Sequence, residues 1–385
     1  MIHTSEKRNK IVMKMMKTAI VFSLGFLLGI GVSVIGYGIH RHINFAMKAQ
    51  RIRDRTFIVL DRALGGMLGA EVRAAKLKHI VPPGPYFPPG SIWTQDVSHA
   101  PLDLQSSTMI TWLKDAGGWG NDNKMQIDFE MRVMQADAKT PMVRFTEGPG
   151  WFARDSDQVS SIPLPVFGGI EGEPGYQCPR DPADCHLIIV DRGQGKLYEA
   201  YQATKTDDAI SANFLAIWNL NRVYPPSGRG DQCTSADAAG FPIAPLLFSA
   251  DELATGSINH AIRFILPNPR IRAHFFVHPA THAGGPSGPI SAPPMGAHFR
   301  LKASFDMSKL DPAAQVVARA MQKYGMFLSD GGSIALTAQS DQDTEMKYID
   351  LDFDSHSLRA LKVTDFEVVD GGEPIPLTYS CVRNP

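Results

Sequence analysis

The segment HLIIVDR, residues 186–192, decides the class of fold. It places four consecutive apolar residues between a histidine and an aspartate, which is typical of a buried strand. Similar short apolar or alternating runs recur along the chain: MQIDFEMRVM (125–134), HAIRFIL (260–266), AHFFVH (273–278), HFRLKASFDM (298–307), YIDLDFD (348–354) and FEVVD (366–370). Gly, Pro, Asn and Asp separate these runs, so each predicts a strand of about five to nine residues. Many strands and few helices indicate a mainly β domain, either a sandwich or barrel-like.

Two segments of this region are typical of helices. DPAAQVVARAMQKYG, residues 311–325, begins with Asp311 as N-cap and Pro312 in the first turn, and Gly325 ends it. SADELATG, residues 249–256, contains the capping-box pair Ser249 and Glu252. The sequence therefore predicts few helices, and these are short.

The N-terminal run TAIVFSLGFLLGIGVSVIGYGI, residues 18–39, predicts a single transmembrane helix. Its 22 residues contain no charged side chain, and at about 1.5 Å per residue they span roughly 33 Å, enough for the hydrocarbon core of a bilayer. The alternative is a secretory signal peptide, whose apolar core is usually about 7–15 residues long and ends at a small-x-small cleavage site. This run is longer and continues into His40, Arg41 and His42, which favours an uncleaved signal anchor.

The cysteines set the predicted orientation, because basic residues flank the span on both sides. The four cysteines, Cys178, Cys185, Cys233 and Cys381, all lie far downstream of the span. An even number there indicates two disulfides in an oxidising compartment, with Cys178 and Cys185 closing the tight loop CPRDPADC. A zinc site is the weaker alternative, since the six-residue gap exceeds the usual two to four, and the pairing of Cys233 and Cys381 is left open. We therefore expect a bacterial inner-membrane protein with a cytoplasmic N-terminus and a periplasmic main domain.

Composition shifts divide the chain into five predicted parts. VPPGPYFPPG holds five prolines in ten residues and ends any helix before it. Gly25 and Gly29 form a GxxxG pattern that predicts helix packing within the membrane. The parts are a basic cytoplasmic tail (1–17), the transmembrane helix (18–39), a juxtamembrane helical stalk (40–80), the proline-rich linker (81–90) and the extracytoplasmic β-rich domain (91–385).

Charge is distributed unevenly along the chain. Residues 1–80 contain 14 Lys and Arg against four Asp and Glu, whereas residues 81–385 contain 24 against 35 and so carry a net charge of −11. An acidic domain argues against nucleic acid as its partner. The basic neck fits the anionic surface of a lipid bilayer, although an ordinary charged linker helix would have the same composition.

Several longer segments carry a resemblance to a known family. They are SIWTQDVSHAPL (91–102), IEGEPG (170–175), CHLIIVDRGQGKLYEAY (185–201), TSADAAGFPIAPLLFSADELATGSINHAIRF (234–264), MGAHFRLKASFDM (295–307) and KYGMFLSDGG (323–332). In this order they resemble a family of secreted bacterial proteins that has no established activity, so the resemblance implies no catalytic residues. Some of its members occur beside carbohydrate-binding modules, which favours a polysaccharide as ligand. The predicted anchor and stalk depart from that secreted pattern.

Carboxylates and histidines supply the candidate catalytic residues. Glu171 and Glu199 lie at or near strand ends, as do Glu173 and Asp191, and hydrolysis of a glycosidic bond requires two carboxyl groups. His260 joins Glu171 and Glu199 as the predicted catalytic set. Solvated turn residues would show the same pattern of acids. A lyase-like alternative uses basic groups and a tyrosine around an acidic sugar, with the residues His260, Arg263, Arg300, Lys302 and Tyr324.

Five histidines between residues 260 and 298 suggest a second kind of site. His274 and His278 share one face of a predicted strand, and His282 follows in a Gly-rich loop. Imidazoles with a carboxylate can hold zinc or copper, so these three histidines are the predicted metal ligands. An ordinary core or surface role is the alternative for each of them.

Familiar catalytic motifs are missing from the sequence. GGPSGP lacks the Lys-Ser/Thr ending of a phosphate-binding loop, and neither GxSxG nor HExxH occurs. We therefore expect a binding or accessory subunit of a membrane or envelope assembly, held in the lipid bilayer. The alternative is a membrane-tethered hydrolase or lyase acting on polysaccharide. The sequence identifies no cofactor.

Overall fold

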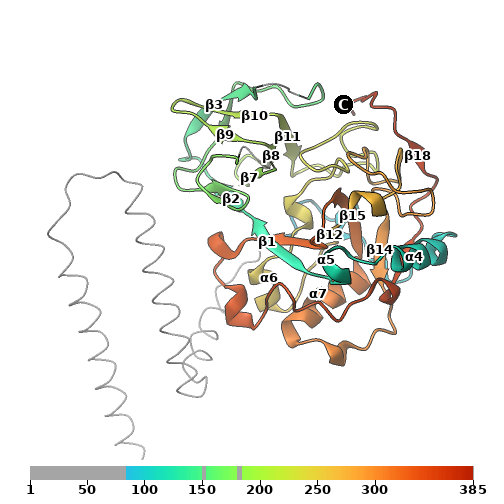
Figure 1. Ribbon diagram of the computed structural model, residues 1–385. Coiled ribbons are helices and arrows are strands. Elements are labelled where there is room, and N and C mark those ends of the chain that lie inside the picture. Colours follow the sequence, from blue (N-terminus) through green and yellow to red (C-terminus); the bar gives the residue numbers. More distant parts are fainter. Residues whose placement is uncertain (1–83, 150–152, 180–183, 385) are drawn as a thin grey trace, which may run out of the picture. The chain divides into compact units, whose positions relative to one another are not determined.

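The structure, a computed structural model, describes residues 84–149, 153–179 and 184–384 (Figure 1). The predicted tail (1–17), membrane span (18–39, with Gly25 and Gly29) and stalk (40–80) lie outside the described residues. Within the described ranges, no helix combines the length and apolar character needed to cross a membrane.

The described residues are mainly β with short helices, as predicted. The largest sheet has the order β1-β16-β12-β15-β14-β17, with bounds Ile127–Met131 (β1), Leu336–Gln339 (β16), Ile262–Leu266 (β12), Met326–Gly331 (β15), His298–Leu301 (β14) and Phe366–Val369 (β17). In it β1 runs parallel to β16 and β12 runs parallel to β15, whereas the other neighbours are antiparallel.

Two four-stranded sheets and two strand pairs complete the β structure of the described part. One sheet has the order β11-β8-β7-β2, with bounds Phe214–Asn219, Lys196–Tyr201, His186–Asp191 and Val133–Ala136. The other has the order β4-β3-β10-β9, with bounds Ser161–Pro163, Met142–Glu147, Ala209–Ala212 and Thr204–Lys205. The pairs are β13 (Phe275–Phe276) with β18 (Ile375–Pro376) and β5 (Gly169–Ile170) with β6 (Glu173–Pro174).

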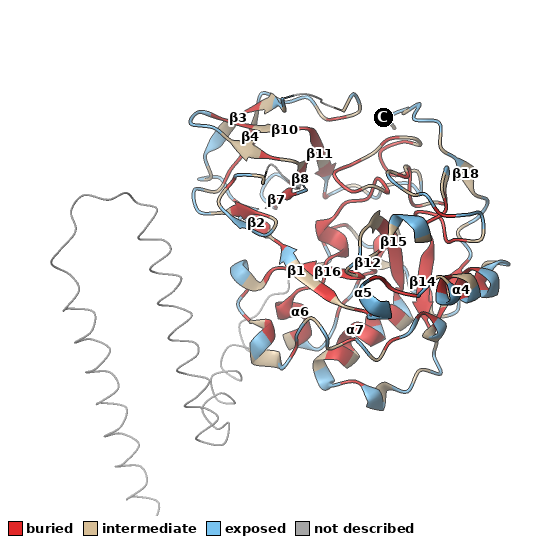
Figure 2. Ribbon diagram, viewed as in Figure 1, coloured by how far each residue is buried: buried red, intermediate tan, exposed pale blue. Residues whose placement is uncertain are grey.

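Strand β7 is buried on both faces, as Figure 2 shows by its red colour. Ile188 and Val190 point into a large core shared with the six-stranded sheet and the helices. Leu187 and Ile189 point the other way, into a smaller core shared with the sheet of β3 and β10. The unbroken apolar run of HLIIVD follows from this position, because successive strand residues alternate between two apolar environments.

The predicted strand MQIDFEMRVM is divided between two sheets. Its first part is β1 at the edge of the six-stranded sheet, and its second part is β2 at the edge of the β7 sheet. Arg132 lies between them, and its Nε donates to Asp343 Oδ2 at 2.6 Å. One continuous stretch of chain therefore connects the two sheets (Figure 1).

Both predicted helices are present. The first is α7 (Pro312–Lys323), which has Asp311 at its N-cap position. The second is α6 (Ala250–Thr255), in which the predicted capping box of Ser249 and Glu252 is formed. Helix α4 (Ser106–Asp115) was not predicted, and its N-cap Gln105 makes no side-chain cap hydrogen bond. The one-turn α5 (Gly120–Asn123) contains the left-handed residues Asn121 and Asp122.

Three predicted strands are shorter or different in the structure. HFRLKASFDM keeps only the four residues of β14, and its last residue begins the 3-10 helix η4 (Met307–Lys309). AHFFVH keeps only the two strand residues Phe275 and Phe276, because His274 adopts φ 65° and interrupts the extended backbone. YIDLDFD contains the 3-10 helix η6 (Tyr348–Leu351), which ends at Asp352 in the left-handed region. Its alternating apolar residues Ile349, Leu351 and Phe353 do not share one buried face, since Phe353 is buried whereas Ile349 is 64% exposed.

Two disulfides are formed, as predicted: Cys178–Cys185, which the sequence indicates, and Cys233–Cys381, whose pairing the sequence left open. The second joins residues 148 positions apart and ties the C-terminal segment to the loop after Gly230. At Gly230 (φ 134°) a Cβ atom would lie 2.0 Å from the carbonyl oxygen of Val382. A glycine is therefore required for the two segments to approach this closely.

The end of the proline-rich segment is packed into the domain. Tyr86 and Phe87 are buried and belong to the large core. The ring of Phe87 makes edge contacts with Trp218 at 6.4 Å and with Tyr224 at 5.7 Å. Burial of apolar side chains thus begins before Ser91.

Because both faces of β7 are packed, truncating a side chain on either face should lower the free energy of unfolding by a similar amount. We expect Ile188→Ala and Ile189→Ala each to lower the free energy of unfolding of the full chain by about 3 kcal/mol, because both side chains are fully buried. Chemical denaturation measures the difference. Val166→Ala is the control, since Val166 is 69% exposed and should change stability by less than about 0.5 kcal/mol. A cost below about 1 kcal/mol at either isoleucine would contradict burial of both faces.

Candidate functional site

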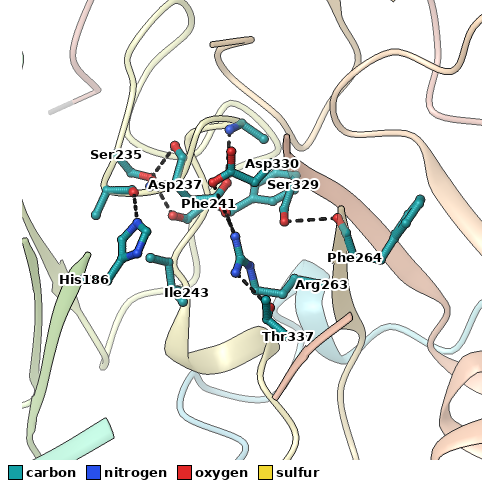
Figure 3. A network of polar contacts seen from close by, with 12 residues as sticks. His186, Ser235, Asp237, Phe241, Ile243, Arg263, Phe264, Ser329, Asp330 and Thr337 are labelled. Atoms are coloured by element: carbon teal, nitrogen blue, oxygen red, sulfur yellow. Dashed lines mark hydrogen bonds and ion pairs between the residues drawn. The ribbon is translucent and has the colours of Figure 1, made fainter. Parts of the chain in front are cut away.

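A buried charged cluster lies where the six-stranded sheet meets the loop of residues 235–243 (Figure 3). Its centre is Arg263 on β12, which is 1% exposed. Arg263 Nη2 donates to Asp237 Oδ2 at 2.7 Å, and Nη1 donates to Thr337 Oγ1 at 2.8 Å. The same Nη2 lies 3.6 Å from Asp330 Oδ2. We call Arg263, Asp237, Asp330 and Thr337 the central cluster.

Strand pairing brings the central cluster together. Strands β15 and β16 both pair with β12, so they carry Asp330 and Thr337 to positions beside Arg263. Asp237 comes from a loop instead, and Ser235 shapes that loop by donating its hydroxyl to the carbonyl of Phe241 at 2.6 Å. Two stretches of chain that are distant in sequence, residues 235–243 and residues 326–339, therefore converge on the Arg263 guanidinium.

Burial and mutual repulsion control ionisation of the two aspartates. Burial raises the pKa of Asp237, and the nearby Asp330 raises it further, while the Arg263 guanidinium opposes both effects. Burial also raises the pKa of Asp330, again opposed by Arg263. One guanidinium thus faces two carboxyl groups that hold protons more tightly than an ordinary aspartate does.

An ion pair extends the central cluster toward the β7 sheet. His186 Nδ1 lies 2.6 Å from Glu171 Oε2, and His186 Nε2 lies 2.9 Å from the carbonyl oxygen of Ala236. Burial disfavours the imidazolium, but the Glu171 carboxylate outweighs burial and raises the pKa of His186 to about 9. Burial likewise opposes ionisation of Glu171, yet His186 lowers the pKa of that carboxyl. Both ring nitrogens therefore act as donors, and the pair is ionised at neutral pH.

Asp128 on β1 has a pKa shifted in the opposite direction to that of Glu171. Burial, together with the charges of Glu130 and Glu171, raises its pKa to about 6. Glu171 has a lowered pKa, so the environment separates the proton affinities of two interacting carboxyl groups. Such a separation is what acid and base catalysis by two carboxyl groups requires. Both residues are only partly buried.

Glu199, the second predicted catalytic acid, points into the large core and is 0% exposed. Its Oε1 accepts from the backbone N–H groups of Ile243 and Ala244 at 2.8 and 2.9 Å, and its Oε2 accepts from Trp218 Nε1 at 3.1 Å. Burial raises the pKa of Glu199 to about 7, although the two backbone donors oppose the shift. These bonds hold the start of the 3-10 helix η2 (Ala244–Leu246) against β8.

His260, the third predicted catalytic residue, belongs to a different set of contacts. Its Nε2 lies 3.1 Å from Glu252 Oε1, and Glu252 also closes the capping box of α6. Burial disfavours the charged ring, but Glu252 outweighs it and raises the pKa of His260. Gly84 packs on this pair, since a Cβ there would lie 3.1 Å from Glu252 Oε1. The Tyr86 hydroxyl is buried without a hydrogen-bond partner among the described residues.

The three predicted metal ligands have separate surroundings. His278 Nε2 lies 2.8 Å from Asp231 Oδ1, and His282 Nδ1 lies 3.0 Å from the carbonyl oxygen of Ala238. His274 is exposed. In the described part of the chain, the only group of three or more ligand-type side chains close enough for one ion is Asp155 with Cys233 and Cys381, and these cysteines form a disulfide.

Sequence reasoning selected Glu171 but missed most of its surroundings. Arg263 was considered only for an acid/base alternative, and Asp128, Asp237 and Asp330 were not selected. The sequence signal that could have identified Arg263 and Asp330 is a charged residue within an otherwise apolar strand, as in HAIRFIL and MFLSDG. Such a residue must have a partner if the strand is buried.

Comparisons with models of protein families, with curated proteins and with solved structures give no match for this chain. The resemblance to secreted bacterial proteins therefore stays a prediction.

The His186–Glu171 pair predicts a pH-dependent contribution to stability. The contribution is complete between pH 4.5 and 6.5, the ordinary pKa values of the two groups. As the pH falls below 4.5, the contribution is lost while Glu171, whose pKa is lowered in the folded protein, becomes protonated. As the pH rises above 6.5, the contribution is lost through about pH 9, the raised pKa at which His186 loses its proton in the folded protein. We expect Glu171→Gln to lower the free energy of unfolding by about 3 kcal/mol near pH 6 and by less at pH 9.5.

Denaturation curves at pH 6 and pH 9.5 measure this difference. Glu173→Gln is the matched control, because Glu173 is an exposed glutamate on the neighbouring strand β6. Equal effects of the two substitutions at pH 6 would show that the ion pair does not stabilise the fold.

Proposed function

We propose that this chain is a membrane-anchored protein of the bacterial envelope whose β-rich domain acts as a binding or accessory subunit. In this proposal residues 18–39 form the anchor in the inner membrane and the domain faces the periplasm. Its partners are the lipid bilayer and either other membrane subunits or a polysaccharide, not nucleic acid. The two disulfides support the oxidising compartment.

The observation that carries this proposal is how the predicted catalytic residues are bonded. Glu199 and His260 are fully buried in bonds that hold η2 and α6, and Glu171 is paired with His186. Groups bound in this way stabilise local structure and do not face a common cleft, so they favour a scaffold over a catalyst built from these three residues.

An exposed apolar loop supports a protein partner. Val166 and Phe167, between β4 and β5, are 69% and 83% exposed. Met142 on strand β3 is 54% exposed and lies opposite Pro163, which ends the neighbouring strand β4. Exposed Phe and Met side chains are enriched where proteins contact one another.

The partner-binding proposal predicts loss of copurification when this loop becomes polar. The full chain purified from membranes in mild detergent should retain stoichiometric membrane subunits, and Val166→Ser with Phe167→Ser should release most of them. Ile349→Ser is the control, because Ile349 is 64% exposed elsewhere on the surface. Mass spectrometry of the purified material gives the stoichiometry. A chain that purifies alone, or equal retention by both variants, would contradict a partner at this loop.

A second candidate function rests on Asp128 and Glu171. Their separated proton affinities would let Asp128 act as general acid while the Glu171 carboxylate acts as nucleophile or base in glycoside hydrolysis. This alternative is a membrane-tethered hydrolase acting on polysaccharide.

The hydrolase alternative predicts that the full chain releases reducing ends from at least one glycan of a panel. Asp128→Asn should then lower the rate by about 10²-fold or more, because it removes the proton donor. Asp207→Asn is the control at an exposed acid, and circular dichroism verifies that Asp128→Asn is folded. Absence of cleavage across the panel, or an unchanged rate in Asp128→Asn, would exclude this function for the pair.

A further inference from the structure

Residues 84–90, which end the proline-rich segment, lie on the domain without backbone pairing to its sheets. Among the described residues, the backbone of this segment makes one hydrogen bond to another backbone group, from the Ser91 N–H to the Pro88 carbonyl at 3.2 Å. That bond is local, and the prolines of the segment have no N–H to donate. Pro85 and Gly90 are exposed. We call residues 84–90 the strap.

Two aromatic side chains attach the strap to the domain. Tyr86 and Phe87 are 7% and 5% exposed. The Phe87 ring packs edge-on against Trp218 and Tyr224, and the Arg192 guanidinium lies 5.0 Å from the centroid of the Tyr86 ring. Ring contacts, rather than a backbone ladder, therefore hold the strap in place.

The closed position of the strap leaves one polar group poorly satisfied. The Tyr86 hydroxyl is buried and has no hydrogen-bond partner among the described residues. Burial raises the pKa of Tyr86, and the Glu252 carboxylate raises it further, while the Arg192 guanidinium opposes both effects. A buried hydroxyl without a partner costs free energy relative to a hydrated one. Closure is therefore less favourable than burial of the two rings alone would make it.

The chain that follows the strap is firmly anchored. The Trp93 carbonyl accepts from the Ala261 N–H at 2.7 Å, and the Trp93 ring packs edge-on against Phe241 and Phe327 at 5.2 and 5.6 Å. Gly90 lies between this anchor and the rings of the strap and adopts φ 88°. A glycine has little steric restriction to rotation, and a Cβ at this position would have nothing within 4 Å. Gly90 is therefore suited to act as a hinge.

The other end of the strap covers the ion pair of His260 and Glu252. A Cβ at Gly84 would lie 3.1 Å from Glu252 Oε1 and 3.4 Å from His260 Cδ2. Each residue of the pair is 2% exposed. Segments with few backbone hydrogen bonds to their surroundings open at lower free energy than the core does. Opening of the strap would therefore give solvent access to a charged pair that is otherwise enclosed.

We propose that the strap is a releasable cover, which opens about Gly90 while the rest of the domain stays folded and thereby uncovers His260 and Glu252. This inference goes beyond the proposed function, because it concerns access to a buried pair rather than the binding of a partner. In the anchored protein proposed above, the strap follows the stalk in sequence. Any pull on the membrane-side chain would then act on the strap first.

Native-state proteolysis of the full chain in mild detergent tests whether the strap opens by itself. Chymotrypsin cuts the Tyr86–Phe87 bond only while the strap is open, and mass spectrometry follows the new N-terminus at Phe87 under conditions of at most one cut per chain. The Tyr198–Glu199 bond is the reference, because Tyr198 is 4% exposed on strand β8. Each rate is divided by that of the same bond in a short synthetic peptide. We expect the relative rate at Tyr86–Phe87 to be higher and to rise with urea less than about half as steeply.

Two substitutions should shift the closed strap in opposite directions. Tyr86→Phe removes the unpartnered hydroxyl and keeps a chymotrypsin site, so it should slow cleavage of this bond at least about threefold. Tyr224→Ala removes one of the rings beside Phe87 and should speed cleavage at least about threefold. Tyr379→Ala is the control, because Tyr379 is 68% exposed, and it should leave the rate unchanged. Circular dichroism verifies that each variant is folded.

Chemical modification tests what the open strap uncovers. Tyr86→Ser combined with Phe87→Ser removes both rings that hold the strap. Diethylpyrocarbonate should then modify His260 at least about fivefold faster than in the unchanged chain. His298 is the matched control, because it is also a buried histidine, at 9% exposed, but its partner is the Tyr324 carbonyl. Its rate of modification should not change.

Three results would overturn the inference: equal urea dependence at the two bonds, cleavage of Tyr86→Phe that is no slower, or unchanged modification of His260 in the folded double variant. The first of these would show that the strap opens only when the whole domain unfolds. None of the measurements depends on a copurifying subunit. Failure here would therefore leave the proposed accessory role in place.

Discussion

Burial of Arg263 is the constraint on which the rest of the domain depends. A charged group this deep in the protein is tolerated only with charged or hydrogen-bonding partners. Asp237, Asp330 and Thr337 supply them from three different elements. The register of β12 against its neighbours and the path of the loop around Asp237 are therefore linked, because a shift of either would leave the guanidinium unpaired.

The second constraint is the position of β7 between two cores. A strand buried on both faces needs apolar residues at every position, and its polar ends must have partners. His186 at the start of β7 is paired with Glu171, and it also contacts the loop that carries Asp237. The two constraints therefore meet at one histidine, which connects the β7 sheet to the central cluster.

The sequence predicts features that depend on near neighbours. HLIIVD was predicted as a strand and SADELATG as a helix, because periodicity and a capping box are local signals. Helix α4 was missed because SSTMITWLKD begins without a capping side chain. The prediction of YIDLDFD as a strand was wrong because its apolar residues alternate in the sequence without sharing a buried face: Phe353 is buried, but Ile349 is 64% exposed. The bonding of Glu199 with Trp218 and with the start of η2 could not be predicted, because sequence shows an acid but not the donors that a distant segment brings to it.

Arg263 and Arg229 are both buried, and each has an Nε without a hydrogen-bond partner among the described residues. Arg263 has two carboxyl groups of the chain beside it. Arg229 shares the Asp157 carboxylate with Arg383, which is 40% exposed at its side chain. Removal of one partner from a buried ion pair leaves an uncompensated charge, whereas an exposed pair is screened by solvent. The arrangement of the interior therefore depends more on Asp237 than the C-terminal segment depends on Arg383.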